Sequence, residues 1–272
     1  MNYRHAFHAG NHTEVFKHAA LVFILERLLE KPQPFAVLDT HAGIGWYDLR
    51  SEAAQKTREY EDGVAKVAGR ALSSAPAYSR LIEAMNPDGL QAYPGSPEIV
   101  SRFLREQDRL MACELHPSDA VTLKARYRRD RRISVHQRDG YEAIRGLLPP
   151  PERRGLVFID PPYEQTDEAE RLALALGVGL ERWSTGVFMA WYPIKDRRIS
   201  DVLSRAAGAF PKALRAEFLP YAEDEASLPG SGIIVCNTPW KLDERLSALC
   251  AELSGLLGNG RGSWTVDWLT AP

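Results

Sequence analysis

Short apolar runs recur along the chain, and most of them end in an acidic residue or a glycine. The runs lie at 35–38, 110–113, 133–135, 156–159, 186–191, 214–219, 233–236 and 264–269. Stretches with helical spacing separate several of them, at roughly 118–130, 167–182, 196–207 and 241–256. Strands that alternate with helices are typical of a doubly wound, parallel sheet. We therefore predict an α/β fold.

A helix is expected near the N-terminus, after an irregular arm of about ten residues. Asn11, followed three positions later by Glu14, resembles a capping box that begins this helix. The pair Lys31-Pro32 ends it, because proline does not continue a helix. The stretch Ala19–Leu25 is apolar on all sides, which predicts that this helix is buried.

Residues 47–108 interrupt the alternation of strands and helices. They are polar and rich in alanine, and they contain the turn signal Asn86-Pro-Asp-Gly89. We interpret them as an inserted, mainly helical subdomain. It returns through Tyr93–Pro97, which is too rich in proline and glycine for a helix or a central strand. The chain is thus divided into an arm, helix and first strand (1–46), the insertion (47–108) and the remainder of the core (109–272).

Composition excludes several classes of protein. A length of 272 residues fits one domain with an insertion, and a net charge of −2 argues against a generally basic nucleic-acid binder. The three cysteines are far apart and lack zinc-ligand spacing, which favours free thiols in a reducing compartment. The polar N-terminus lacks the core of a signal peptide, and no apolar run approaches the ~18 residues of a membrane span. We expect a cytoplasmic protein without a metal site or membrane contact.

Four carboxylates follow predicted strands: Asp39, Glu114, Asp139 and Asp160. An acidic residue after a strand is often only a helix cap or a turn residue. However, ligands of open α/β sheets bind beyond the carboxyl ends of the strands, at the point where the strand order reverses. Four such acids together favour a single binding site.

The loop after the first strand carries Gly43 and Gly45, but the full dinucleotide fingerprint is absent. Glu114, at the end of the next core strand, can accept hydrogen bonds from both hydroxyls of a ribose. Asp139 can accept a hydrogen bond from an adenine amino group. No segment cradles a pyrophosphate, so this pattern favours S-adenosylmethionine over a nicotinamide dinucleotide.

The segment Asp160-Pro161-Pro162-Tyr163 ends an apolar run and has a specific chemical logic. The carboxylate of Asp160 and the carbonyl of Pro161 can each accept one N–H of an aromatic amine, since the two prolines hold the backbone extended. These bonds favour a tetrahedral nitrogen that can attack a methyl group. Tyr163 can stack on the base. The alternative is that the two prolines merely terminate a strand.

Other candidates are less specific. Asn237–Trp240 and Trp191–Pro193 also follow apolar runs; we interpret the first as a strand-to-helix turn and favour a buried structural role for both, although the aromatic rings of the second could line a base pocket. The N-terminal histidines His5, His8, His12 and His18 lack accompanying cysteines or spaced carboxylates, which disfavours a metal site. From composition alone they fit a polar tail, and the alternative is an arm that clamps substrate and cofactor.

Several segments together resemble the motifs of the RlmJ family, the adenine-N6 methyltransferases of 23S ribosomal RNA. The resemblance is carried nearly end to end by Tyr3–His18, Leu38–Gly43, Tyr93–Pro97, Arg105–Asp108, Glu114–Asp119, Ile159–Tyr163 and Trp191–Pro193. It implies a Rossmann-like class I S-adenosylmethionine-dependent methyltransferase fold with an inserted helical subdomain. One departure is Thr238, where the family pattern has proline.

The resemblance also implies roles for single residues. Contacts to S-adenosylmethionine are implied for His18, His41, Ser96, Glu114, Asp139, Gly140 and Asp160, beside the Gly43 of the glycine loop. Asp160 is implied to be the catalytic acceptor, with Pro161 and Tyr163 beside it and with His5 and Lys17 near the reaction centre. Tyr3 is implied to contact RNA, and Arg4 is a candidate for a phosphate contact.

The substrate implied by the resemblance is an adenosine of 23S rRNA, bound by a monomer. An adenine within a helix cannot enter such a pocket, so it must be flipped out or already unpaired. The cluster of arginines at 126, 128, 129, 131 and 132 could meet phosphate or could be a solvated helix end. The alternatives are a DNA adenine-N6 methyltransferase, a methyltransferase of a protein glutamine, and a cofactor-binding RNA chaperone without catalysis.

Overall fold

The computed structural model describes residues 5–222, 228–258 and 260–272, which form an α/β fold around one eight-stranded sheet. The strand order is β10-β8-β9-β7-β6-β1-β4-β5. The strands are β1 (Ala36–Asp39), β4 (Arg109–Glu114), β5 (Ile133–Gln137), β6 (Gly155–Ile159), β7 (Val187–Pro193), β8 (Leu214–Leu219), β9 (Ser231–Cys236) and β10 (Ser263–Trp268). All eight predicted apolar runs lie in these strands, so the predicted α/β class is confirmed.

The sheet is mixed, which corrects the expectation of an all-parallel sheet. Strands β1, β4, β5, β6 and β7 pair in parallel, whereas β9 pairs antiparallel with both β7 and β8, and β10 pairs antiparallel with β8. The chain leaves β1 toward β4 and β5 and later continues from β6 toward β7 on the other side. The strand order therefore reverses between the neighbours β1 and β6, and their carboxyl ends form the expected position of a ligand site.

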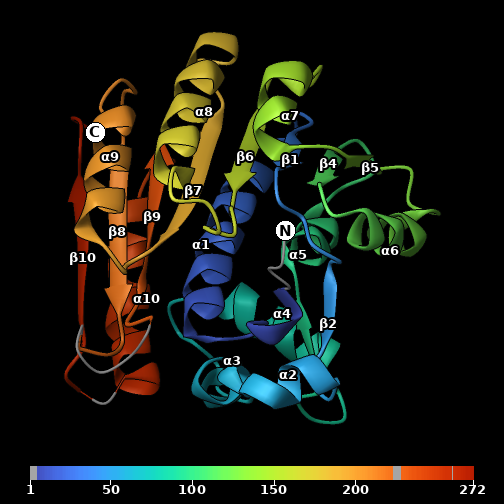
Figure 1. Ribbon diagram of the computed structural model, residues 1–272, viewed down its shortest axis with the longest axis vertical. Coiled ribbons are helices and arrows are strands. Elements are labelled where there is room, and N and C mark those ends of the chain that lie inside the picture. Colours follow the sequence, from blue (N-terminus) through green and yellow to red (C-terminus); the bar gives the residue numbers. More distant parts are fainter. Residues whose placement is uncertain (1–4, 223–227, 259) are drawn as a thin grey trace.

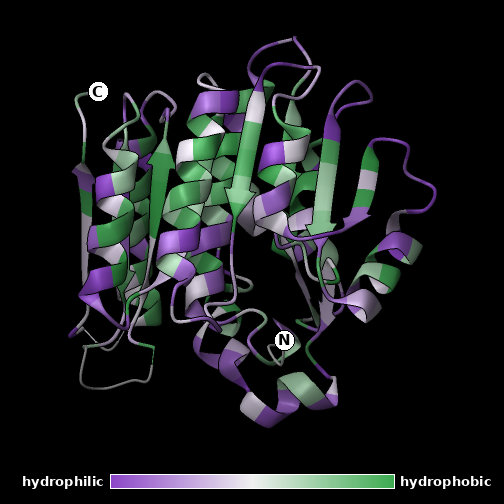
Figure 2. Ribbon diagram, turned by 45° about the horizontal axis from the view of Figure 1, so that its top comes forward, coloured by the Kyte–Doolittle hydropathy of each residue, from purple (hydrophilic) through white to green (hydrophobic). Residues whose placement is uncertain are grey.

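Helices cover both faces of the sheet (Figure 1). One face carries α7 (Gly140–Leu147), α8 (Glu168–Arg182) and α9 (Arg197–Ala207), and the other carries α1 (His12–Leu29), α5 (Ser96–Phe103) and α10 (Leu242–Leu257). The helix α6 (Pro117–Tyr127) packs beside β4 and β5. Figure 2 shows mainly apolar strands and helices that carry both apolar and polar residues. The core accordingly divides into two apolar clusters, one on each face of the sheet.

The N-terminal helix confirms one prediction and corrects another. Every residue of Ala19–Leu25 is buried, because α1 lies against the sheet between α5 and α10. The Asn11 side chain caps the helix by accepting the Glu14 amide at 3.0 Å. The reciprocal half of a capping box is absent, since the Asn11 amide donates to the His8 carbonyl and the Glu14 carboxylate bonds other side chains.

The segment 46–95 adds a small layer beyond the carboxyl ends of the core strands, where Figure 1 shows α2 and α3. It consists of β2 (Trp46–Asp48), α2 (Glu52–Thr57), a 3₁₀ turn at Glu59–Asp62, α3 (Val64–Val67), α4 (Pro76–Met85) and β3 (Ala92–Pro94). Strands β2 and β3 pair with each other outside the main sheet. The helix α5, which lies within the predicted insertion 47–108, packs against α1 and β4 of the core. The boundaries of the insertion at residues 47 and 108 therefore stay a prediction.

Two local predictions were incomplete. The segment Tyr93–Pro97 was excluded from helices, yet α5 begins at Ser96 with Pro97 in its first turn. Proline is tolerated there because the first amides of a helix have no intrahelical acceptor. The helix α7 was not predicted, although Asp139 caps it. In the part of the chain that the structure describes, no helix is both long and apolar enough to cross a membrane.

Candidate active site

A cavity of about 420 Å³ lies at the carboxyl ends of β1, β4 and β6. The described candidates from the sequence all line it: His5, Lys17, His18, His41, Gly43, Ser96, Glu114, Asp139, Gly140, Asp160, Pro161 and Tyr163. Tyr3 and Arg4 lie outside the described residues. Asp39 differs from the other strand-end acids, because it is fully buried beneath the cavity. The described residues that were predicted from the sequence thus lie around one cavity, and the role of each residue stays a prediction.

One end of the cavity is shaped by backbone groups around Glu114. Its carboxylate accepts the amide of Gly43 at 2.8 Å and the amide of His116 at 2.7 Å. Burial raises the pKa of Glu114, and the two amides oppose that shift. Gly43 has a φ of +61°, and a Cβ there would meet the Tyr47 hydroxyl at 2.2 Å. Glycine is therefore required both for the turn and for the close approach of the tyrosine.

The same end includes the start of α7 and the side chain of His41. A Cβ at Gly140 would meet the Thr40 carbonyl at 2.2 Å, so α7 begins in direct contact with the loop after β1. His41 Nδ1 lies 2.8 Å from the Thr40 hydroxyl. Burial lowers the pKa of His41 to about 4, which leaves this imidazole neutral at neutral pH.

Asp39, the last residue of β1, is buried and does not line the cavity. Its Oδ1 accepts the His41 amide at 3.3 Å. Burial raises the pKa of Asp39 to about 7, and the nearby carboxylates of Asp160 and Glu114 add to this rise. Its ionisation is therefore coupled to the charge of the site above it.

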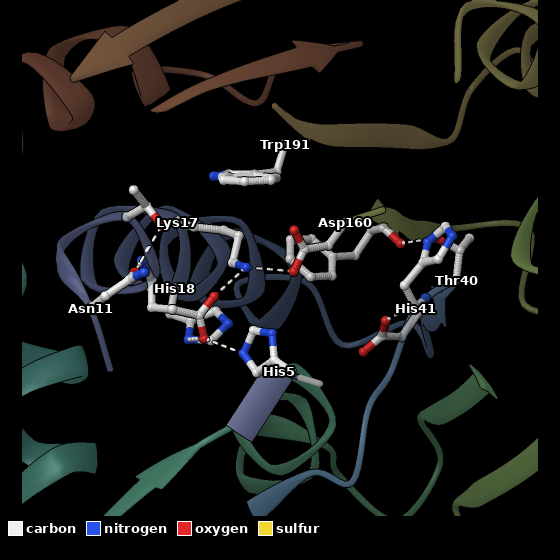
Figure 3. A network of polar contacts seen from close by, with 12 residues as sticks. His5, Asn11, Lys17, His18, Thr40, His41, Asp160 and Trp191 are labelled. Atoms are coloured by element: carbon white, nitrogen blue, oxygen red, sulfur yellow. Dashed lines mark hydrogen bonds and ion pairs between the residues drawn. The ribbon is translucent and has the colours of Figure 1, made fainter. Parts of the chain in front are cut away.

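The other end is built from side chains that come from distant parts of the chain. The Lys17 ammonium, on α1, forms ion pairs with both Glu14 and Asp160. Glu14 also bonds His5 Nε2 at 2.8 Å. Glu14 and Lys17 are almost completely buried, while Asp160 keeps about a tenth of its side chain exposed. Figure 3 shows the ammonium directed at one oxygen of Asp160, with the other oxygen turned toward Trp191.

The Lys17 ammonium thus pairs with two buried carboxylates, and the pKa values of these two carboxylates shift in opposite directions. Burial opposes every charge here, but Asp160 and Glu14 together raise the pKa of Lys17. Although burial works against it, the pKa of Glu14 falls well below its ordinary value, because His5, Lys17 and His18 surround it. Burial raises the pKa of Asp160, and Lys17 opposes that rise only in part. Asp160 is consequently the better proton acceptor of the two.

Two aromatic rings complete this end. The Lys17 ammonium lies 5.2 Å from the centre of the Trp191 ring. Tyr163 contacts Trp191 edge to face with ring centres 5.9 Å apart, and its hydroxyl donates to the Trp191 carbonyl at 3.2 Å. Tyr163 adopts a φ of +52°, a costly conformation for a bulky residue that is found mostly at functional sites.

These positions correct part of the sequence interpretation. The favoured structural role of Trp191 is wrong in that its ring lines the cavity, whereas Tyr192 is buried and bonds Glu217 at 2.8 Å. Asn237 and Thr238 form the predicted turn between β9 and α10. Trp240 is 70% exposed, so the expected buried role does not hold for it.

Three of the four N-terminal histidines belong to the cavity wall rather than to a loose polar tail, and the fourth, His12, is buried in α1 with its ring against Tyr221. His18 Nδ1 lies 3.0 Å from the Tyr93 hydroxyl, and burial lowers the pKa of His18 to about 3. His5 and His8 also line the cavity, and His8 Nδ1 lies 2.9 Å from Glu59. Among the described residues, no group of three or more His, Cys, Asp or Glu side chains is arranged to hold a metal ion.

Glu14, Tyr141, Glu168 and Arg171 are among the residues of the wall that sequence reasoning missed. Glu14 was assigned to a capping box; its spacing of three from Lys17 on the helix was an available signal, whereas nothing in the local pattern indicates its contact with His5. Tyr141 follows the predicted Asp139-Gly140 pair directly, which was an available signal. Glu168 and Arg171 are spaced by three on α8 and so share one helix face, but their spacing alone does not show what that face contacts.

Known proteins resemble this chain over nearly its whole length. A family model described as "Ribosomal RNA large subunit methyltransferase D, RlmJ" matches residues 32–270. The protein named "Ribosomal RNA large subunit methyltransferase J" of Escherichia coli K12 is 39% identical over 279 aligned positions, which cover 99% of both chains. The protein of the same name from Haemophilus influenzae is 37% identical, with 99% of both chains covered.

A solved structure shows the same fold. The Legionella pneumophila protein LPL1258 superposes with a TM-score of 0.89 at 32% identity, covering 96% of this chain and 98% of that one. With the strand order described above, this agreement confirms the predicted Rossmann-like fold.

Proposed function

Because the chain belongs to the RlmJ family of ribosomal RNA large subunit methyltransferases, we propose that it methylates the exocyclic N6 of an adenosine in 23S rRNA. The cofactor proposed is S-adenosylmethionine. The observation that carries the chemistry is the position of Asp160, whose carboxylate lines the same cavity as Glu114 and Asp139. An acceptor for the target amine and acceptors for a nucleoside cofactor therefore share one space.

The residues around the cavity fit such a cofactor. Two wall glycines, Gly43 and Gly140, leave no room for a Cβ, which keeps the backbone close to the cavity. Glu114 receives one amide on each oxygen and retains lone pairs for ribose hydroxyls. A volume of about 420 Å³ is within the ~300–1,000 Å³ of common ligand pockets. When bound, S-adenosylmethionine supplies an electrophilic methyl group and leaves as a thioether.

The protein's own contribution at the amine is to accept its protons and hold it. One oxygen of Asp160 receives Lys17, and the other has no hydrogen-bond donor within the described ranges. We assign this second oxygen to one N–H of the target amine and the Pro161 carbonyl to the other. The raised pKa of Asp160 suits it to take the proton that the amine loses.

The aromatic rings of Trp191 and Tyr163 support a nucleobase as the substrate. Trp191 and Tyr163 form the wall beside Asp160, and flipped bases are commonly held by stacking on such rings. Extracting a base from a helix costs a few kcal/mol, so an unpaired adenosine is the easier substrate. We therefore favour a loop of 23S rRNA over duplex DNA.

The test is methyl transfer from labelled cofactor to 23S rRNA from cells that lack this gene, followed by digestion and identification of the methylated nucleoside. We expect N6-methyladenosine in rRNA and no transfer to duplex DNA. Asp160→Asn should lower the turnover by ~10²–10⁴-fold. Asp201→Asn, an exposed aspartate on α9, is the matched control and should act like the wild type.

Two results would contradict the proposal in different ways. Transfer to duplex DNA but not to rRNA would replace the substrate with that of a DNA adenine-N6 methyltransferase. Full activity of Asp160→Asn would leave the substrate in place and remove the proposed catalytic group.

A further inference from the structure

Asp139 is a cavity carboxylate whose hydrogen bonds can be counted atom by atom. Its Oδ1 accepts the amides of Tyr141 at 2.8 Å and Glu142 at 3.1 Å, as the N-cap of α7. Its Oδ2 accepts Nη2 of Arg171, from α8, at 3.2 Å. An ionised carboxylate offers about four lone-pair positions, of which three are thus filled. The fourth belongs to Oδ2 and is left for a donor in the cavity.

Arg171 is itself held in place by other groups. Its guanidinium lies over the Tyr141 ring, 4.8 Å from the ring centre. Its Nη1 lies 3.7 Å from Glu168 Oε1, and the Tyr141 hydroxyl donates to that same oxygen at 2.7 Å. Glu168 is buried, with 3% of its surface exposed. The arginine is therefore fixed by a ring and a carboxylate before it reaches Asp139.

This arrangement restricts what Asp139 can do. Held by a guanidinium and two amides, the carboxylate stays an acceptor and cannot turn its free position away from the cavity. Such an acceptor binds the 6-amino group of adenine, which donates, and opposes a 6-oxo group, which does not. Arg171 is not available as a general anion site, because its guanidinium already pairs with the carboxylates of Asp139 and Glu168.

We infer that Arg171 is a positioning residue that fixes Asp139 to select a cofactor with a 6-aminopurine. The inference rests on the proposed function, in which Asp139 meets the adenine of S-adenosylmethionine. Arg171 acts through Asp139 and needs no contact with the methyl group or the target base. Arg171 is thus a determinant of cofactor specificity that lies on a helix, α8, and not at the end of a strand.

The experiment measures the affinity of two product analogues by titration calorimetry. S-adenosylhomocysteine carries the 6-amino group, and S-inosylhomocysteine differs by a 6-oxo group. We expect the wild type to prefer the first by about tenfold or more, the discrimination of one hydrogen bond to a charged group. Arg171→Gln should weaken S-adenosylhomocysteine by about tenfold, leave S-inosylhomocysteine nearly unchanged and bring their ratio toward one. Arg171→Lys, which keeps the charge but loses the planar fork, should give an intermediate ratio.

The control is Arg198→Gln, which removes an arginine that pairs with Glu170 of α8 outside the cavity. It should leave both affinities at the wild-type values. If Arg171→Gln weakens both analogues equally and keeps their ratio, the arginine only clasps α7 to α8, and the inference is overturned. If the wild type binds both analogues alike, the adenine contact of Asp139 fails, and the inference fails with it. Methyl transfer with Asp160→Asn tests the proposed function separately.

Discussion

The two ends of the cavity are built in different ways. At the cofactor end, Asp139 is held by the amides of the first turn of α7, and Glu114 is held by the amide of His116 and by that of Gly43 from the loop after β1. At the catalytic end, Asp160 is held by Lys17, which lies 143 residues away in the sequence, and Lys17 is held in turn by Glu14. The first arrangement uses mainly backbone amides close to the acid in sequence, with Gly43 and Arg171 as the distant donors, whereas the second depends on α1 being packed against the sheet.

Because the two ends are held differently, substitutions at one end should affect mainly ligand binding and substitutions at the other mainly the stability of the fold. Backbone amides can still donate to an uncharged side-chain oxygen, so changing one of these acids should affect the ligand more than the fold. The ion pairs of Glu14 and Lys17 are buried, and removing Glu14 takes away one of the two carboxylates that compensate the charge of Lys17. The catalytic end should therefore be sensitive in stability and the cofactor end in affinity.

The largest expected effect is that of Glu14→Gln. It removes one of the two carboxylates that pair with Lys17. Removing one partner of a buried ion pair costs ~3–5 kcal/mol. Urea denaturation should show that loss in the free energy of unfolding. Glu26→Gln is the control on the same helix, because Glu26 pairs with Arg245 at the surface and should cost at most ~1 kcal/mol. Equal losses for the two variants would show that the buried network has no special role in stability.

Asp39, buried at the end of β1, should make stability depend on pH. Its folded pKa of about 7 lies above the ordinary value of 3.8, so the folded state holds a proton that the unfolded state has lost. This contribution to stability is full below the unfolded pKa, declines as the pH rises and is gone above about pH 7. Asp39→Asn cannot titrate, so its stability relative to the wild type should rise by up to ~3 kcal/mol from about pH 5 to pH 8. Denaturation curves at several pH values measure this, and a difference that does not vary with pH would refute it.

At the cofactor end, Glu114→Gln should act mainly on affinity. Both oxygens of Glu114 accept a backbone amide, and glutamine keeps an acceptor for only one of them, so the free energy of unfolding should fall by ~1–3 kcal/mol, less than for Glu14→Gln. Loss of the acceptor for the ribose hydroxyls should weaken S-adenosylhomocysteine by ~10–100-fold in calorimetry. A large loss of stability with unchanged affinity would reverse the comparison between the two ends.

The same contrast explains how much could be predicted from sequence. Strand-end acids could be found because a strand, its last residue and the following turn are contiguous, which places Glu114, Asp139 and Asp160 on one edge. Glu14 was missed because its local i,i+3 pair with Lys17 on α1 looks like an ordinary helix-face pair, and only the fold brings His5 and Asp160 to the same place. The start of α5 was missed because proline in a first helical turn and proline in a loop look alike in sequence.

The smallest expected effect concerns how a polyanion reaches this cavity. Among the described residues, its wall carries seven carboxylates: Glu14, Glu114, Asp119, Asp139, Asp160, Glu164 and Glu168. Of the lysines and arginines in the wall, Lys17 and Arg171 are paired with carboxylates, whereas Lys195, just after β7, has no ion pair or hydrogen bond in the described part of the chain. Lys195 is exposed, so it is available to a phosphate beside the flipped nucleotide.

Lys195→Gln should therefore raise the KM for rRNA a few-fold, leave the affinity for S-adenosylhomocysteine unchanged, and reduce the slope of log affinity against log salt by about one. Lys124→Gln, an exposed lysine of α6 outside the cavity wall, is the matched control. If both variants reduce the slope alike, the basic groups act as a diffuse surface field. If only Lys195→Gln does, the acidic cavity admits RNA through one defined phosphate contact on the side of Trp191.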